Sequence, residues 1–135
     1  MIRGKISRQN FTASSNVSKF KIEFNKRLIR FSLEIIKVCQ EIRQDRNLGT
    51  IADQLIRSAT SIGANVIEAK ASSSKLDYLK FFQIALKSAN ETKYWLILVR
   101  ESTPKLRNQT NQLLKELDEI AKIIGAGVLT MKGKR

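Results

Sequence analysis

Four stretches of the chain place apolar residues at alternating intervals of three and four, the spacing of one face of an α-helix. The first predicts a helix from about residue 18 to residue 46. Its stripe consists of Phe24, Leu28, Phe31, Ile35, Val38 and Ile42, with Ile29 and Ile36 widening it. The last stretch repeats the pattern at Leu106, Thr110, Leu113, Leu117, Ile120 and Ile124.

Two further helices are predicted between these. One stripe consists of Ile51, Leu55, Ala59, Ile62, Val66 and Ala69. With Ile56 and Ile67 it covers roughly 160° of the helix, at about 100° per residue. That arc is wide for a helix facing one small core, so it predicts a second contact surface, within the bundle or against another subunit. The other stripe consists of Leu79, Phe82, Leu86, Ala89, Leu96 and Val99.

The ends of the helices are marked by residues that cap or interrupt them. Thr50 with Asp53 resembles a capping box at the start of the second helix, and Ser74 with Asp77 resembles one at the start of the third. Pro104 cannot continue a helix but fits the first position of a new one, so the fourth helix is predicted to begin there.

Helices joined by such short breaks predict an all-α fold, an up-down-up-down four-helix bundle over residues 20–125. A basic arm over 1–19 precedes it, and a basic tail over 126–135 follows the glycines Gly125 and Gly127, which are expected to end or kink the last helix. The arm is rich in serine and asparagine and is interpreted as flexible. A β-strand or a short helix ordered by a partner is the alternative.

The charge of the chain is strongly positive. Lys and Arg total 25 against 12 acids, a net charge of +13. A polyanion such as RNA or DNA is the first partner this suggests, with an anionic membrane second and a merely soluble basic protein as the alternative. No stretch approaches the apolar length that spans a membrane, and we expect no membrane partner.

Most of the excess charge lies at the two ends: residues 1–21 contain five cations and no acid, and residues 125–135 contain three cations. Within the body, three cations share one side of the first helix and two lie two turns apart on the third, although such runs are more often solvated faces. The candidate nucleic-acid contacts are Arg3, Lys5, Arg8, Lys19, Lys21, Lys26, Arg30, Lys37, Lys80, Lys87, Lys132, Lys134 and Arg135.

The residues that most enzymes and metal sites use are scarce. The chain has no histidine, the commonest general base and metal ligand, and one cysteine, Cys39, which lies within an apolar stripe. A helical RNase of the HEPN type would need an Arg…His motif. We therefore expect no enzyme activity, no metal and no cofactor. A lone thiol without a disulfide framework favours a cytoplasmic location.

A polar stripe runs beside the apolar stripe of the second helix. It consists of Gln54, Arg57, Ser61, Asn65 and Glu68, at intervals of 3, 4, 4 and 3. Solvent-facing helices usually favour Lys and Glu, so we interpret this stripe as a buried or half-buried structural network in which Arg57 pairs with Glu68 or with Glu91. A solvent face and a ligand or catalytic site are the alternatives. If Arg57 is paired and desolvated, its replacement by alanine should lower the free energy of unfolding by ~3–5 kcal/mol.

The segment 54–69 resembles the second-helix signature of the four helix bundle protein family, also called 23S rRNA intervening-sequence or S23-like proteins. The signature reads approximately Q-L-x-R-A-x-x-S-I-x-x-N-I-x-E-G, and segment 78–91 resembles the family's F-L-x-I-A-x-G-S-x-x-E. The resemblance spans roughly residues 20 to 125. The chain departs from it at Ser58 (usually Ala), Ala69 (usually Gly) and Lys87 (usually Gly).

This resemblance implies a four-helix bundle that assembles as a homopentamer. A related branch comprises the accessory variability proteins of diversity-generating retroelements, basic pentamers that bind a reverse transcriptase and nucleic acid, but the signature is closer to the rRNA branch. The function expected is a non-enzymatic, oligomeric accessory protein that binds RNA or DNA with low sequence selectivity. A protein-interaction scaffold, for example for a reverse transcriptase, is the alternative.

Overall fold

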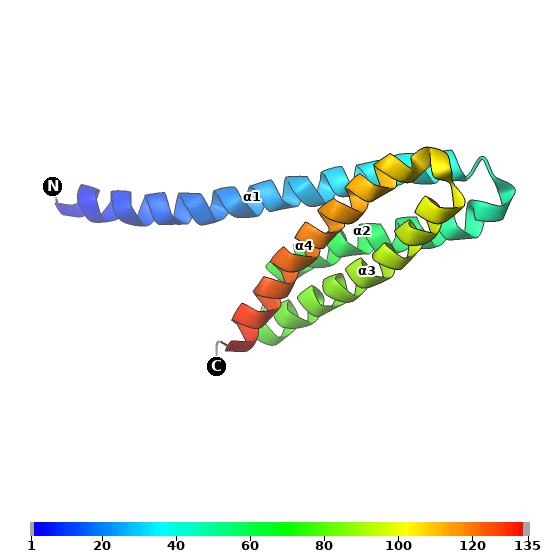
Figure 1. Cartoon of the computed structure of the whole chain (residues 1–135). Helices are drawn as coiled ribbons and strands as arrows, with labels where there is room; N and C mark the ends of the chain where they lie inside the picture. The colour runs from blue at the N-terminus through cyan, green and yellow to red at the C-terminus, as the bar shows by residue number, and fades with distance from the viewer. Residues whose placement is uncertain (1, 134–135) are drawn as a thin grey trace.

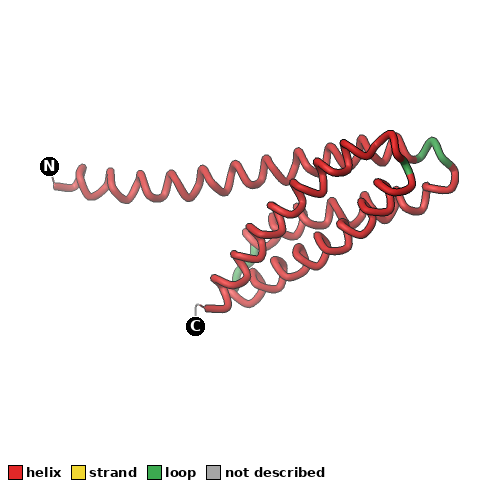
Figure 2. The backbone as a smooth tube through the Cα atoms, viewed as in Figure 1, coloured by secondary structure: helices red, strands yellow, loops and turns green. Residues whose placement is uncertain are grey.

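The computed structural model describes residues 2–133, with side chains described from residue 16 onward. It contains four α-helices and two short 3₁₀ turns, and no strand occurs within this range (Figures 1 and 2). The elements in chain order are α1 (Ile2–Ile42), η1 (Arg46–Leu48), α2 (Gly49–Ala71), α3 (Lys75–Ser102), η2 (Pro104–Leu106) and α4 (Arg107–Gly133). The predicted all-α four-helix bundle is confirmed.

The helices are arranged in sequence order around one core. α2 packs against α1 and α3, and α3 packs against α4, while α1 and α3 are diagonal to each other. α4 closes on α1 mainly near the η1 and η2 end, and the two helices diverge toward the other end (Figure 1). The N-terminal part of α1 projects past the other three helices.

The predicted apolar stripes form this core. Every member of the stripes that begin at Phe24 and at Leu106 is buried. On α2 and α3 the buried set also includes Ala52, Ser58 and Thr92, which the spacing did not single out. Ile29 does not widen the core stripe as expected: it is 53% exposed, on the opposite side of α1.

The first helix begins much earlier than predicted. The sequence places its start near Ser18, with a flexible arm before it, whereas α1 is continuous from Ile2. Residues 5–19 contain neither proline nor glycine, so no residue in the segment interrupts a helix. Serine and asparagine lower helix propensity only modestly and do not end the helix by themselves.

The last helix also runs further than predicted. The expected tail over 126–135 is helical as far as Gly133, and neither Gly125 nor Gly127 ends α4. Gly127 has a packing role instead, because a Cβ built there would lie 2.7 Å from the ring of Phe82. Only glycine lets the α3 ring approach the α4 backbone this closely.

The helix starts show one confirmed cap and one wrong prediction. The Ser74 side chain accepts a hydrogen bond from the Asp77 amide at 3.1 Å, as predicted. Thr50 caps nothing, because α2 begins one residue earlier, and Asp53 instead accepts a hydrogen bond from Arg43 at 2.7 Å. Pro104 does begin a new element, the turn η2, which leads directly into α4.

Within the described part of the chain, none of the helices combines the length and the apolarity that crossing a membrane requires.

Candidate functional site

The polar stripe of α2 lies along its contact with α3. At one end Arg57 donates to the Gln54 side chain from Nε at 3.2 Å and from Nη2 at 2.9 Å. Arg57 also pairs with Glu91 of α3. Oε2 of Glu91 in turn accepts a hydrogen bond from the Trp95 indole at 2.9 Å. The four side chains form a connected cluster that joins two helices.

This cluster is less buried than expected. The Arg57 side chain is 56% exposed and that of Glu91 is 38% exposed. The prediction of a desolvated Arg57 is therefore wrong for the single chain, although the predicted pairing with Glu91 is confirmed. The stripe lies at the edge of the α2–α3 contact, so the long side chains reach water while their stems cover apolar surface.

Glu68 takes no part in the cluster. It is exposed and belongs to no ion pair among the side chains that the structure describes. Eleven positions of a helix separate it from Arg57, a rise of about 16 Å. The predicted pairing of Arg57 with Glu68 is wrong for that reason.

Shorter side chains complete the stripe deeper in the contact. Asn65 donates to the Ser61 carbonyl at 2.8 Å and to its hydroxyl at 2.9 Å, and Ser88 of α3 donates to the same hydroxyl at 3.0 Å. Below them the hydroxyls of Ser58 and Thr92 lie 3.0 Å apart in the core. Ser58 was missed as a member of this network, and the signal that could have found it was its departure from the usual alanine of the signature.

Removing the Arg57 guanidinium should change stability little. We expect Arg57→Ala to lower the free energy of unfolding by about 0.2–1 kcal/mol, because exposed ion pairs contribute little and Glu91 keeps its bond to Trp95. Urea unfolding monitored by circular dichroism measures the change, with Arg43→Ala as a control for another exposed pair. A loss above 3 kcal/mol would contradict this and restore the desolvated network.

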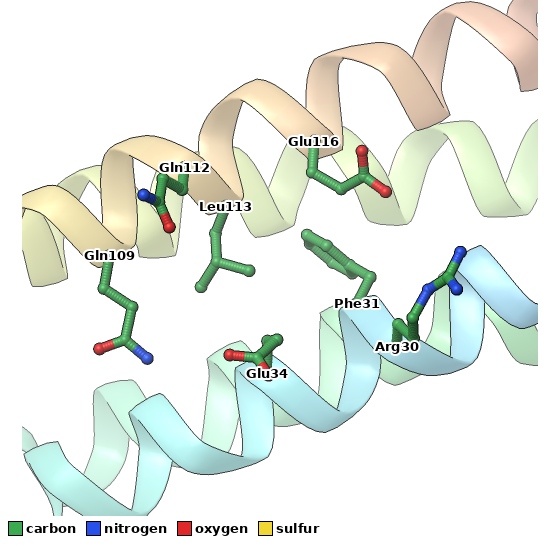
Figure 3. A pocket seen from close by; sticks show the side chains of 7 residues that line it. All are labelled: Arg30, Phe31, Glu34, Gln109, Gln112, Leu113 and Glu116. Carbon is green, nitrogen blue, oxygen red and sulfur yellow. The ribbon is translucent and has the colours of Figure 1, made fainter.

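The candidate cations on α1 are partly neutralised by neighbouring acids. Lys26 lies 3.7 Å from Glu23, and Lys37 lies 3.1 Å from Glu34. Arg30 lines a hollow of about 240 Å³ between α1 and α4. Figure 3 shows that the side chains of Glu34 and Glu116 lie around the same hollow. The negative charge of these acids disfavours phosphate binding on this side of α1.

The remaining candidate cations lie in separate parts of the structure. Lys80 and Lys87 are exposed on α3, which is diagonal to α1, so the fold does not bring them together with the α1 cations. Lys19 and Lys21 are exposed midway along α1, and Lys132 is exposed at the end of α4. Three more candidates, Arg3, Lys5 and Arg8, lie on described backbone without described side chains, and two, Lys134 and Arg135, lie outside the described residues.

Sequence reasoning missed a charged clamp between α1 and α4. Nε and Nη2 of Arg27 donate to the two carboxylate oxygens of Glu116 at 2.8 and 2.7 Å, and Arg27 also pairs with Glu119. The hydrogen bonds to Glu116, which have the largest effect, and to Glu119 raise the pKa of Arg27, so the guanidinium stays charged. Residues 89 positions apart in sequence give no local signal of such a pairing.

Cys39 has the environment of a core residue. It is 1% exposed, and Sγ lies 3.5 Å from the Ala52 carbonyl oxygen. Burial raises the pKa of its thiol to about 11, which disfavours the reactive thiolate at neutral pH. Among the described side chains, no group of three His, Cys, Asp or Glu residues could hold a metal ion.

Comparison with known proteins places this arrangement in a family. The family model described as "23S rRNA-intervening sequence protein" matches residues 21–126. A crystal structure of a protein with unknown function from the S23 ribosomal protein family of Bacteroides thetaiotaomicron is 30% identical, with a TM-score of 0.73. That match covers 78% of this chain and 97% of the other. No curated protein matches. The chain belongs to the 23S rRNA-intervening sequence protein family.

Proposed function

We propose that this chain is a non-enzymatic, oligomeric accessory protein that binds RNA or DNA with low sequence selectivity. The observation that carries the proposal is the projecting start of α1, in a segment of 21 residues with five cations and no acid (Figure 1). The family's description refers to 23S rRNA, which makes RNA the first nucleic acid to test. The absence of histidine and the buried state of Cys39 support a non-enzymatic role.

A helical extension suits a phosphate backbone in a different way from a flexible arm. The part of α1 that precedes residue 16 extends about 20 Å at 1.5 Å per residue, enough to lie along several phosphates. Contacts between cations of this segment and the charged backbone carry no information about base sequence, which suits low selectivity. Several copies in one assembly would strengthen individually weak contacts through effective concentration.

A salt titration tests the proposal. Fluorescence anisotropy of labelled single-stranded RNA and duplex DNA of mixed sequence should show binding at 50 mM salt. We expect affinity to fall with salt at a log–log slope of about −0.7 to −0.9 for each phosphate contacted. The absence of detectable binding at 50 mM would remove nucleic acid from the partners.

The oligomeric part of the proposal is supported by an apolar face that the bundle leaves uncovered. Ile22, Ile29 and Leu33 lie on the outer face of α1, opposite the core stripe, and each is more than half exposed. On α2, Ile67 is 48% exposed one turn after Gly63, which packs on Leu28 of α1. Exposed apolar residues that gather on one side of a helix, as on α1, typically mark an interface between proteins.

We expect light scattering at micromolar concentration to report a mass near five times 15.4 kDa, as a closed ring of five copies requires. Leu33→Lys, which places a charge within the outer face of α1, should reduce the mass toward that of one chain. Leu76→Lys is the matched control, since Leu76 is exposed on α3 outside this face. A monomeric wild-type protein would refute the assembly.

The same apolar face supports a second function, a protein-interaction scaffold with a partner such as a reverse transcriptase. In that case the positive charge serves solubility, and the partner binds the outer face of α1. Partner binding that survives high salt and is lost in Leu33→Lys, without nucleic-acid binding at 50 mM salt, would favour the scaffold.

A further inference from the structure

A groove of about 370 Å³ lies where α1 and α4 diverge, at the start of α3. Its walls are Val17, Phe20 and Phe24 of α1, Tyr78 and Phe82 of α3, and α4 between residues 123 and 130. The volume falls within the range of small-molecule pockets, about 300–1,000 Å³. The groove is separate from the polar stripe of α2.

The α1 and α3 side chains that line the groove form an aromatic floor, and its shape depends on close packing. The rings of Phe20 and Phe24 stack with centroids 6.5 Å apart, and those of Tyr78 and Phe82 stack at 4.7 Å. Gly127 lets the α4 backbone lie close to the Phe82 ring, because any side chain at this position would clash with that ring. Phe20 remains 60% exposed, so apolar surface is left uncovered.

Two lysines, Lys21 and Lys70, provide the only charges of the groove lining, and the described lining contains no carboxylate. Lys70 donates to the amide oxygen of Asn25 at 2.7 Å, a neutral partner. Burial, and secondarily the charge of Lys21, lowers the pKa of Lys70. Two cations that repel each other beside an apolar floor fit a ligand with one anionic end.

We propose that this groove binds a free aliphatic carboxylate, with its chain over Phe24 and Phe82 and its carboxylate between Lys21 and Lys70. An inorganic anion would leave the aromatic floor exposed to water. A second copy of the chain is disfavoured as occupant, because a chain with a net charge of +13 would not neutralise the two lysines of the groove. This proposal is independent of nucleic-acid binding.

Calorimetric titration with dodecanoate, below the concentration at which it forms micelles, tests the proposal. Each methylene withdrawn from water should raise affinity about fourfold. Dodecanoate should therefore bind up to about 200-fold more tightly than octanoate. Dodecyltrimethylammonium has the same chain with a positive end and is expected to bind at least tenfold more weakly than dodecanoate.

Variants separate this site from general adsorption. Lys70→Met should weaken dodecanoate binding about tenfold or more through loss of a charge-assisted hydrogen bond. Ala126→Trp should block the groove, because Ala126 lines it from an exposed position. Lys87→Met, an exposed lysine of α3 outside the groove, is the matched control and should bind normally. Circular dichroism verifies that each variant is folded.

Equal affinity for the anionic and cationic amphiphiles would overturn the proposal, as would unchanged binding in both folded groove variants. Binding only to intact phosphatidylglycerol vesicles, without binding of free dodecanoate, would also overturn it, because the groove would then not accept a single carboxylate.

Discussion

Leu96→Ala is expected to lower the free energy of unfolding by about 2–5 kcal/mol. Leu96 lies in the C-terminal half of α3 with none of its surface exposed, among the buried residues of all four helices. Truncation removes its buried methyl groups and leaves a cavity that the surrounding helices fill only in part. Urea unfolding followed by circular dichroism measures the loss.

Leu76 provides the matched control, since it is the same residue type on the same helix and is 75% exposed. Leu76→Ala should change stability by less than about 0.5 kcal/mol. Similar losses in the two variants would contradict the packing described here. A small loss of unfolding free energy in Leu96→Ala would by itself mean that this part of α3 is not in the core of the folded protein.

Neutralising the cations of residues 1–21 is expected to have the largest effect on nucleic-acid binding. Replacing Arg3, Lys5, Arg8, Lys19 and Lys21 with glutamine should flatten the log–log salt slope by about four if all five contact phosphates. Affinity at 50 mM salt should fall about equally for every RNA and DNA sequence, because phosphate contacts carry no sequence information. Anisotropy titrations at four salt concentrations measure both effects.

The control removes equal charge from elsewhere on the surface. Glutamine at five lysines outside the candidate set lowers the net charge by the same amount and should leave the slope nearly unchanged. These positions are Lys75, Lys93, Lys105, Lys115 and Lys122, all exposed on α3, η2 and α4. If both variants lose the same slope, net charge governs binding and the start of α1 has no special role.

Much of the fold could be predicted because the same spacing of apolar residues recurs in all four helices. The stripes beginning at Phe24 and at Leu106 identified buried residues correctly, since a period near 3.6 places them on one face. Ile29 shows where this reasoning fails. An apolar residue next to the stripe in sequence can lie on the opposite side of the helix, and the protein leaves it exposed.

The polar stripe was predicted as a pattern, but its burial was not. The spacing of Gln54, Arg57, Ser61 and Asn65 indicates one side of a helix, and the position of that side relative to α3 depends on how the two helices pack. Packing leaves Arg57 at the edge of the contact and places Ser58 inside it. Apart from the departure of Ser58 from the usual alanine of the signature, no local signal in the sequence distinguishes these two environments.

By itself the sequence determined the helical class, the apolar stripes, the Ser74 cap, the break at Pro104 and the family signature, because all of these depend on residues close together along the chain. Tertiary structure decided which distant residues meet: Arg57 with Glu91, Arg27 with Glu116, and Gly127 with Phe82. It also decided that the outer face of α1 stays uncovered and that α1 and α4 diverge into a groove with two lysines. Such contacts arise from the rotation and splay of packed helices, which the spacing of residues within one helix does not specify.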